Sequence, residues 1–203
     1  MRWDKLFDDL ESQLEHELSA EELDLEAEEE RLRLGRLGLR DRLVGLHETQ
    51  GRGSTYRVAV TLGSGIRLQL HPVTFGRDWL SADLVADDGV GSGARAQCIL
   101  PLSSIAGVSL TRQQVAASLT AVAVDDHPAL SGRLGMSFVL RDLCRRRRAV
   151  DVVLGSHELH GTLDRVGRDH LDIAVHERGA ARRESAVREY RVVPLVALQY
   201  VRL

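Results

Sequence analysis

The sequence predicts an α+β protein that is mostly β, with two five-stranded small barrels in tandem, each preceded by a helix. Three observations predict this fold. A set of short segments recurs after about 92 residues. Apolar and polar residues alternate in short runs, which is typical of half-buried strands. An acidic N-terminal stretch has its apolar residues at helical spacing, which predicts a helical arm.

The internal repeat consists of three segments that recur in the same order. They are Leu62-Gly63-Ser64 with Leu154-Gly155-Ser156, Gly76-Arg77-Asp78 with Gly167-Arg168-Asp169, and Pro101-Leu102 with Pro194-Leu195. Such a repeat indicates two copies of one supersecondary unit. The repeated residues are strand and turn positions rather than acids, bases or nucleophiles. The repeat therefore predicts a duplicated architecture and no duplicated reaction centre.

These patterns divide the chain into four parts. They are a helical arm at 1–47, a first barrel at 48–110, a linker at 111–130, and a helix with the second barrel at 131–203. Each barrel has five predicted strands, and a helix is predicted over 131–145. The strands are predicted at 56–62, 66–70, 79–85, 96–100, 105–110, 150–154, 159–164, 169–175, 184–193 and 197–203.

The arm is predicted to contain two helices. The capping-box pattern from Ser19 to Glu22 predicts that the second one begins at Ala20. Leucines then recur every seven residues, at Leu25, Leu32, Leu39 and Leu46. Gly35 and Gly38 predict a break, since glycine lowers helix propensity. We expect this leucine stripe to dock on the barrels in preference to a partner helix.

Charge is unevenly distributed along the chain. Residues 1–30 hold 13 acidic residues against Arg2 and Lys5, whereas the other 173 hold 17 acidic and 25 basic ones. This division predicts either a basic body that meets nucleic acid or an acidic arm that folds over that body. The sequence has no run of about 18 apolar residues, so it predicts no membrane span. With no apolar leader at the N-terminus, we expect a cytoplasmic protein that does not contact membranes.

The second copy resembles the Sm-like and bacterial Hfq small barrels, which are SH3-like in shape. The likeness rests on Val150–Leu154, on the segment 159–169, and on the Pro194-Leu195 step before the last strand. Gly161 suits the sharply bent second strand of that family. The first copy has His71 or Pro72 there, and a proline places a strand at an edge or a bulge. The family's RNA-contacting residues are not recognisable in either copy.

The whole chain also resembles a family of uncharacterised actinobacterial cytosolic proteins. That likeness rests on the start Met1-Arg2-Trp3 and on the segment Asp164-Arg165-Val166-Gly167-Arg168-Asp169. It implies a cytosolic location and brings no activity, cofactor or ligand with it.

Several patterns that carry chemistry in other proteins have ordinary structural interpretations here. His157 and His160 are three apart on a predicted strand, so they face opposite sides and predict no metal site. The segment 89–93 is glycine-rich but lies between strands, which favours a loop over a phosphate cradle. Cys98 and Cys144 lie in no nucleophile motif. Asp78 and Asp169 are expected to bond their own backbone in turns. We expect no enzyme, no cofactor and no metal.

The candidate binding feature is a set of arginines. They are Arg141, Arg145, Arg146, Arg147, Arg148, Arg165, Arg168, Arg182 and Arg183. Such a set predicts contact with the phosphates of RNA or DNA, although a solvated charged surface is the plainer interpretation. Exposed aromatic residues for base stacking are scarce. The sequence favours a nucleic-acid-associated regulatory factor. The alternative is a scaffold that binds a protein partner through the N-terminal helices or a barrel groove.

Overall fold

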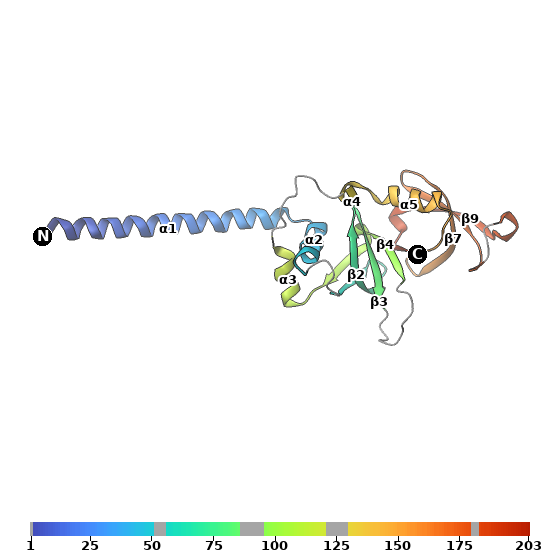
Figure 1. The fold of residues 1–203 in the computed structure, drawn as a ribbon, viewed down its shortest axis with the longest axis horizontal. Helices are drawn as coiled ribbons and strands as arrows, with labels where there is room; N and C mark the ends of the chain where they lie inside the picture. The colour runs from blue at the N-terminus through green and yellow to red at the C-terminus, as the bar shows by residue number, and fades with distance from the viewer. Residues whose placement is uncertain (1, 51–55, 86–95, 121–129, 180–182) are drawn as a thin grey trace. The chain divides into compact units, whose positions relative to one another are not determined.

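The computed structural model describes residues 2–50, 56–85, 96–120, 130–179 and 183–203 (Figure 1). It divides into two compact units, Met1–Gly38 and Leu39–Leu203. The first unit is the helix α1 (Arg2–Arg36). The second contains all the strands and the remaining helices of the described residues. The segment 89–93 lies outside the described residues.

Helix α1 is continuous, so the prediction of a second helix starting at Ala20 is wrong. Ser19 lies inside the helix because the residues around it are mostly Glu, Leu and Ala, which have high helix propensity. The predicted break near Gly35 and Gly38 is confirmed, since α1 ends at Arg36 and α2 begins at Leu39.

The described part of the second unit has one helix before its first five strands and three short helices before its last five. Its helices are α2 (Leu39–Gln50), α3 (Arg112–Leu119), α4 (Leu130–Arg133) and α5 (Met136–Arg145), with 3₁₀ turns η1 (Leu102–Ser104), η2 (Glu184–Ala186) and η3 (Leu195–Ala197). Its strands are β1 (Val58–Leu62), β2 (Arg67–Phe75), β3 (Trp79–Val85), β4 (Gln97–Pro101), β5 (Ile105–Ser109), β6 (Ala149–Leu154), β7 (His157–Val166), β8 (His170–Val175), β9 (Glu189–Pro194) and β10 (Tyr200–Arg202).

The ten strands form a single antiparallel sheet in the order β5-β1-β2-β3-β4-β10-β6-β7-β8-β9. The prediction of an α+β, mostly β protein is therefore confirmed. Closed barrels are not observed, because the sheet is open and ends at β5 and β9. Strand β4 of the first copy pairs with β10 of the second, so the two copies meet edge to edge (Figure 1).

The two copies fold in the same way. Each contributes its strands in the order fifth, first, second, third, fourth. The second strand of each copy has a register shift at the same place, between Pro72 and Thr74 in β2 and between Leu163 and Arg165 in β7. Of the edge or bulge that a proline predicts, the bulge is observed beside Pro72, and β7 has the same bulge without a proline.

Each copy has its own hydrophobic core, and each core includes residues of the other copy. The first core includes Val153 and Tyr200 from the second copy. The second core includes Trp79 and Ile99 from the first copy. Burying one large aliphatic side chain stabilises the fold by roughly 1.5–3 kcal/mol, so these exchanged residues hold the junction together.

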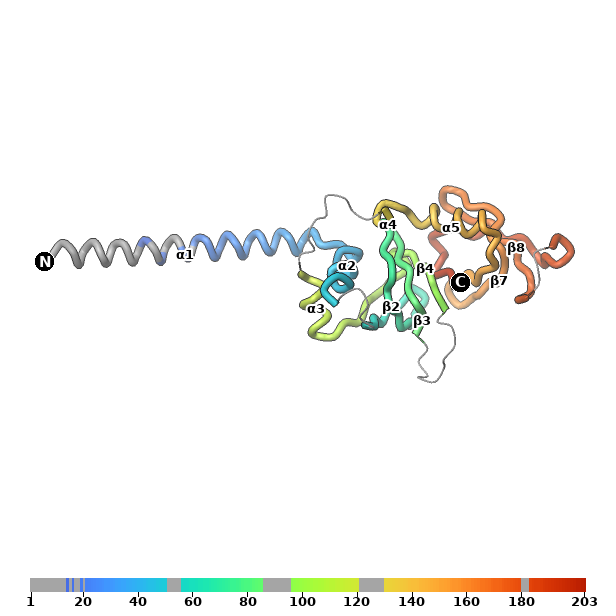
Figure 2. The backbone as a smooth tube through the Cα atoms, viewed as in Figure 1, coloured from blue at the N-terminus to red at the C-terminus, as the bar shows by residue number. Residues whose placement is uncertain are grey.

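The leading helix of each copy packs on its own core. Leu43 and Leu46 of α2 are buried in the first core, which confirms docking for this part of the leucine stripe. Helix α3, which forms within the expected linker, lies against α2 (Figure 2). Thr111 and Gln114 make a full capping box at its start. The hydroxyl of Ser118 on α3 accepts hydrogen bonds from Arg42 on α2.

Candidate nucleic-acid interface

Helix α5 positions the first group of candidate arginines. Its buried residues are Met136, Leu140 and Leu143, which fall on one face at helical spacing. Phe138 and Arg145 lie on the opposite face and are exposed. The amphipathic pattern that docks α5 on the second core therefore turns its arginines toward solvent.

Arg141 holds the fold together in addition to carrying charge. Its Nε and Nη2 donate to the carbonyls of Val166 and Gly167, at 3.3 and 3.2 Å. Arg40, its counterpart in the first copy, donates through Nε to the carbonyl of Gly76 at 2.7 Å. The same contact in both copies shows that Arg141 ties the leading helix to the end of the second strand.

Three further arginines near the end of α5 pair with aspartates. Arg145 and Arg146 both contact the carboxylate of Asp142, the latter at 2.6 Å. The hydrogen bond from Arg145 holds the pKa of Asp142 below its ordinary value, and Arg146 adds to this effect. Arg147 contacts Asp164 of β7 at 2.9 Å. Since one aspartate serves two arginines, this end of α5 keeps an excess of positive charge.

The remaining arginines near β7 are exposed. Arg165 lies 3.5 Å from Asp172. For Arg148 and Arg168, the described part of the chain offers no carboxylate within ion-pair distance. Both therefore present a guanidinium to solvent.

The last two candidates do not join this group. Arg183 is exposed and immediately precedes η2, on the segment that leads into β9. Arg182 lies outside the described residues. Seven of the nine candidates lie on α5, on β7 or directly after one of them. Arg141 and Arg145 are on α5, Arg165 is on β7, and the other four follow these elements. Helix α5 and strand β7 lie against each other (Figure 2).

We call this surface the arginine face. It consists of Arg141, Arg145, Arg146, Arg147, Arg148, Arg165 and Arg168. Three aspartates, Asp142, Asp164 and Asp172, pair with four of these arginines. The face is therefore positively charged after all of its ion pairs are counted. Guanidinium groups bind phosphate in a bidentate manner, so this surface suits a polyanion.

Aromatic side chains are mostly in the cores, as expected from their strand positions. Tyr56, Phe75, Trp79 and Tyr200 are buried. Phe138 is 54% exposed and stands on α5 beside the arginines, whereas Tyr190 is 60% exposed on β9. Phe138 thus adds one stacking surface to the arginine face.

A second polar cluster, which sequence reasoning missed, crosses the second copy. The Asp151 carboxylate accepts from Arg202 at 2.9 and 3.0 Å and lies 2.6 Å from His160 Nδ1. Arg178 also contacts Asp151, at 3.0 Å. Burial acts to raise the pKa of Asp151, but the hydrogen bonds from His160 and Arg202 outweigh burial and hold that pKa below its ordinary value.

The described contacts of this cluster are ion pairs and hydrogen bonds within the second copy. The positions of Asp151, His160 and Arg202 are occupied in the first copy by Ala59, Gln69 and Ser109, in that order. The charged cluster therefore belongs to the second copy alone. A catalytic histidine of a triad needs a nucleophile in hydrogen-bond reach. The described contacts of His160 are to Asp151 and to the ring of His176, whose centroid is 5.3 Å away.

The metal and thiol alternatives gain no support in the described residues. They contain no group of three or more His, Cys, Asp or Glu residues that is arranged to hold an ion. His157 and His160 lie on strand β7, as predicted. Cys98 is buried, and burial raises the pKa of its thiol to about 12, so it is not a thiolate at neutral pH.

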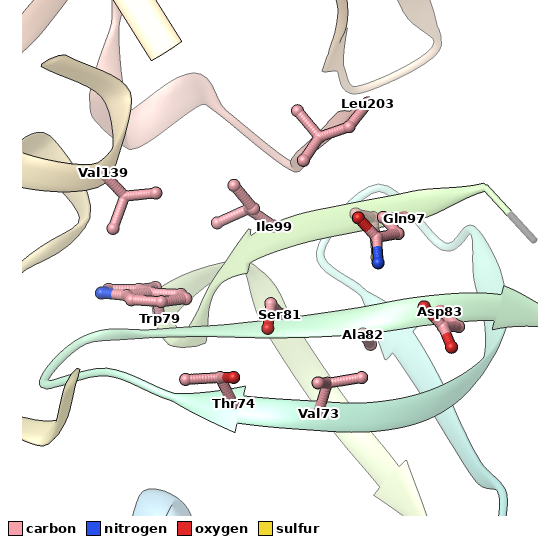
Figure 3. A pocket seen from close by; sticks show the side chains of 11 residues that line it. Val73, Thr74, Trp79, Ser81, Ala82, Asp83, Gln97, Ile99, Val139 and Leu203 are labelled. Atoms are coloured by element: carbon pink, nitrogen blue, oxygen red, sulfur yellow. The ribbon is translucent and has the colours of Figure 1, made fainter. Parts of the chain in front are cut away.

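A shallow hollow of about 170 Å³ lies where the two copies meet (Figure 3). Trp79, Ile99, Val139 and Leu203 form much of its wall, and Asp83 stands at one side. Pockets for small molecules enclose roughly 300–1,000 Å³. This hollow is smaller, and its lining is mostly apolar, so it suits packing between the copies better than a substrate.

Comparisons with protein-family models, with curated proteins and with solved structures found no match. Within the described residues, none of the helices combines the length and the apolar character needed to cross a bilayer. The geometry of the arginine face and of the open sheet therefore carries the proposals that follow.

Proposed function

We propose that the protein is a non-enzymatic regulatory factor that binds RNA or DNA through phosphate contacts at the arginine face. In this proposal each half of the sheet is a small bent barrel-like unit, and the second unit carries the binding surface. The observation that supports the proposal is the excess of seven arginines over the three aspartates that pair with them, on α5, on β7 and on the segments beside these elements.

The chemistry of the face favours the nucleic-acid backbone over the bases. Arginines neutralise phosphates and release condensed counterions, which gives affinity without sequence preference. Phe138 is one exposed ring, and base-stacking recognition uses several aromatic side chains along a strand. We expect weak sequence preference and strong dependence on salt.

The test is fluorescence anisotropy with labelled RNA and with duplex DNA over a series of salt concentrations. The slope of log K against log salt is about −0.9 for each neutralised phosphate of a duplex. Replacing Arg148 and Arg168 together by Gln is expected to weaken binding and reduce the magnitude of the slope by about 2. These two residues are chosen because neither has a carboxylate partner in the described part of the chain.

The matched control removes two exposed arginines from the first copy. The double variant Arg57→Gln and Arg67→Gln loses the same charge but leaves the arginine face intact. We expect it to bind as the wild type does, apart from a small uniform loss from the lower net charge. The proposal is wrong if the wild type binds neither nucleic acid at low salt, or if the two double variants behave alike.

A second candidate function is a scaffold that binds a helix through α1. The exposed apolar residues of α1 favour it, since Leu25 and Leu32 are seven apart and solvent-exposed. Heptad spacing suits packing against another helix. The test is affinity capture with the wild type and with the double variant Leu25→Glu and Leu32→Glu. A scaffold predicts a protein that the wild type retains and the variant loses.

A further inference from the structure

Helix α1 carries a line of exposed leucines. Leu14, Leu25 and Leu32 are eleven and seven residues apart, which are close to whole numbers of helical turns, so they fall on one line along the helix. All three side chains are exposed, Leu25 by 62%. We call this line the leucine seam. An apolar line of this kind is typical of a helix face that packs against another helix.

The leucine seam lies between two rows of glutamates. Helical spacing places Glu21 and Glu28 on one side of it and Glu22 and Glu29 on the other. These four side chains are exposed. Residues 21–30 hold seven acidic residues and no basic one, and two of the seven pair with arginines of the same helix. The seam is therefore set in a strongly negative surface.

The exposed side of α5 has the complementary pattern. Phe138 and Arg145 are seven residues apart, and Arg141 lies between them on the same side. All three are exposed, and the exposed Arg148 follows the end of the helix. The arginine face thus sets one exposed ring among guanidinium groups. The leucine seam sets exposed leucines among carboxylates, at the same seven-residue spacing.

We propose that α1 of a second molecule of this chain packs along α5 and occupies the arginine face when no nucleic acid is bound. The occupant is argued from charge complementarity between the two surfaces. Leu25 and Leu32 then cover Phe138. The glutamates beside the leucine seam pair with Arg145 and Arg148. The contact removes apolar side chains from water and joins carboxylates to guanidinium groups, which form strong hydrogen bonds with them.

Charge disfavours the alternative in which α1 pairs with α1 of a second molecule. Two leucine seams in contact would bring together the acidic residues of both helices. Like charges beside the seam of a helix pair are destabilising, whereas opposite charges there set the choice of partner. The arginine face supplies the opposite charge within the same chain.

The contact makes nucleic-acid binding depend on the concentration of the protein. Carboxylates of α1 and phosphates would use the same guanidinium groups, so one excludes the other. By linkage, nucleic acid releases α1 to the same extent as α1 weakens nucleic-acid binding. This regulation rests on the proposed function, whereas the contact between two molecules does not.

The first test is the mass of the full chain without nucleic acid, measured by sedimentation velocity and light scattering at low salt. The wild type is expected to exceed the mass of one chain, 22.5 kDa, increasingly with concentration. Two chains that exchange their helices are the smallest closed assembly. Added salt is expected to reduce the mass, because it screens exposed charges. A wild type that stays monomeric at every concentration would overturn the proposal.

A charge exchange identifies the surfaces that meet. Glu22→Lys with Glu29→Lys reverses the charge beside the leucine seam, and Arg145→Glu with Arg148→Glu reverses part of the arginine face. Each double variant alone brings like charges together and is expected to be monomeric. In an equal mixture, the two altered surfaces attract each other and so do the two unaltered ones, so assembly is expected to return. A double variant that assembles alone, or a mixture that stays monomeric, contradicts the contact.

The matched control reverses two other charges of α1. Glu26 and Glu30 are exposed and, by helical spacing, point away from the leucine seam. Glu26→Lys with Glu30→Lys is expected to assemble as the wild type does, apart from a small loss from the change in net charge. A control that loses assembly as fully as the Glu22 and Glu29 variant would show that the seam is not the contact.

Circular dichroism checks that each variant is folded. If Arg145→Glu with Arg148→Glu is unfolded, Arg145→Gln with Arg148→Gln takes its place. This variant removes the two charges without adding new ones, and it is expected to need a higher protein concentration than the wild type to assemble. Assembly at the same concentration would contradict the role of these arginines.

A short duplex of RNA or DNA separates this proposal from the proposed function. When it is added to the assembled wild type at low salt, it is expected to bind and to reduce the mass to that of one chain with its duplex. A duplex that binds while the assembly stays intact would place α1 on another surface and overturn the proposal. A duplex that does not bind contradicts the proposed function, and the charge exchange still decides the contact.

Discussion

Asp78 of the first copy caps the leading helix of the second. Its Oδ1 accepts the backbone N–H of Met136 at 2.7 Å, at the first turn of α5. The residue at the N-cap position itself, Gly135, has no side chain to do this. An aspartate from another strand thus supplies the cap and the negative charge that a helix N-terminus favours. The contact ties the two copies together beside β4 and β10.

Replacing Asp78 by Ala is expected to lower the free energy of unfolding by about 1 kcal/mol, the usual effect of losing a helix cap. Urea unfolding followed by circular dichroism measures it. Asp169→Ala is the matched control, because Asp169 holds the corresponding position but its carboxylate contacts the adjacent His170 and its own backbone N–H, not the start of a helix. Equal losses in the two variants would show that Asp78 does not act as a cap.

Gly161 lies at a close approach between β7 and β8. A Cβ at this position would stand 2.2 Å from the carbonyl oxygen of Ala174, which is backbone and cannot turn aside. Gly161→Ala is therefore expected to destabilise the fold by roughly 1–3 kcal/mol or more. Gly63→Ala is the control, since its nearest neighbour would be 3.8 Å away. Thermal unfolding compares them, and an unchanged melting temperature for Gly161→Ala would contradict the geometry.

Arg141 and Arg148 are both arginines of the arginine face, but they are expected to differ in their effect on stability. Arg141→Gln loses hydrogen bonds to the carbonyls of Val166 and Gly167, and is expected to lower stability by roughly 0.5–1.5 kcal/mol. Arg148→Gln is expected to change stability little, because its side chain is exposed. Urea unfolding of both variants checks this. The opposite order would contradict the role of Arg141 in the fold.

Asp151 is expected to make the free energy of unfolding depend on pH in the acid range. Its pKa is lower in the folded protein than in the unfolded chain, so its contribution is present above the unfolded value of about 3.9 and is lost as pH falls through the folded value. Arg178, Arg202 and His160 are the groups that face it. The stability difference between wild type and Asp151→Asn should shrink as pH falls below about 5.

Urea unfolding at a series of pH values measures this difference. Asp24→Asn, at an exposed position on α1, is the control and is expected to show no such change. A difference that stays constant down to pH 3 would contradict the ion pairs of Asp151.

The duplicated strands could be predicted from sequence because their signals are local. Alternation of apolar residues and repeated turn glycines placed a strand at 79–85, which is β3, and most others within a few residues of their observed ends. The strand predicted over 184–193 begins only at Glu189, because 184–186 form the 3₁₀ turn η2. Strand β2 extends to Phe75, beyond its expected end at residue 70, because the bulge after Pro72 lets the strand continue. The counterpart of Gly161 is Leu70, not His71 or Pro72. Gly161 lies opposite Val150 and Leu70 lies opposite Val58, and these two valines hold the same position in the two copies.

The contacts across the junction could not be predicted, because they join residues that are far apart in the sequence. The two-residue turn at Gly155 and Ser156 fixes His160 opposite Asp151, so half of the Asp151 cluster was accessible from local spacing. Arg202 joins it only because β10 pairs with β6. Asp78 was expected to bond its own turn, and its carboxylate instead caps a helix that begins 58 residues later.

The arginine candidates were predictable as a basic set but not as individual contacts. Their clustering at the end of α5 follows from the sequence, whereas the pairing of Arg147 with Asp164 depends on how α5 lies on β7. Phe138 is exposed on the same helix. Helical spacing alone places it opposite Leu140 and Leu143.

Two copies of one β unit join edge to edge through β4 and β10. The most direct measurement is the nuclear Overhauser effect between the Hα protons of Cys98 and Arg202. These residues form a pair without mutual hydrogen bonds, whose Cα atoms lie about 4.5 Å apart, so the account predicts a strong cross-peak. A spectrum in which both Hα protons are assigned and no cross-peak joins them would contradict the account.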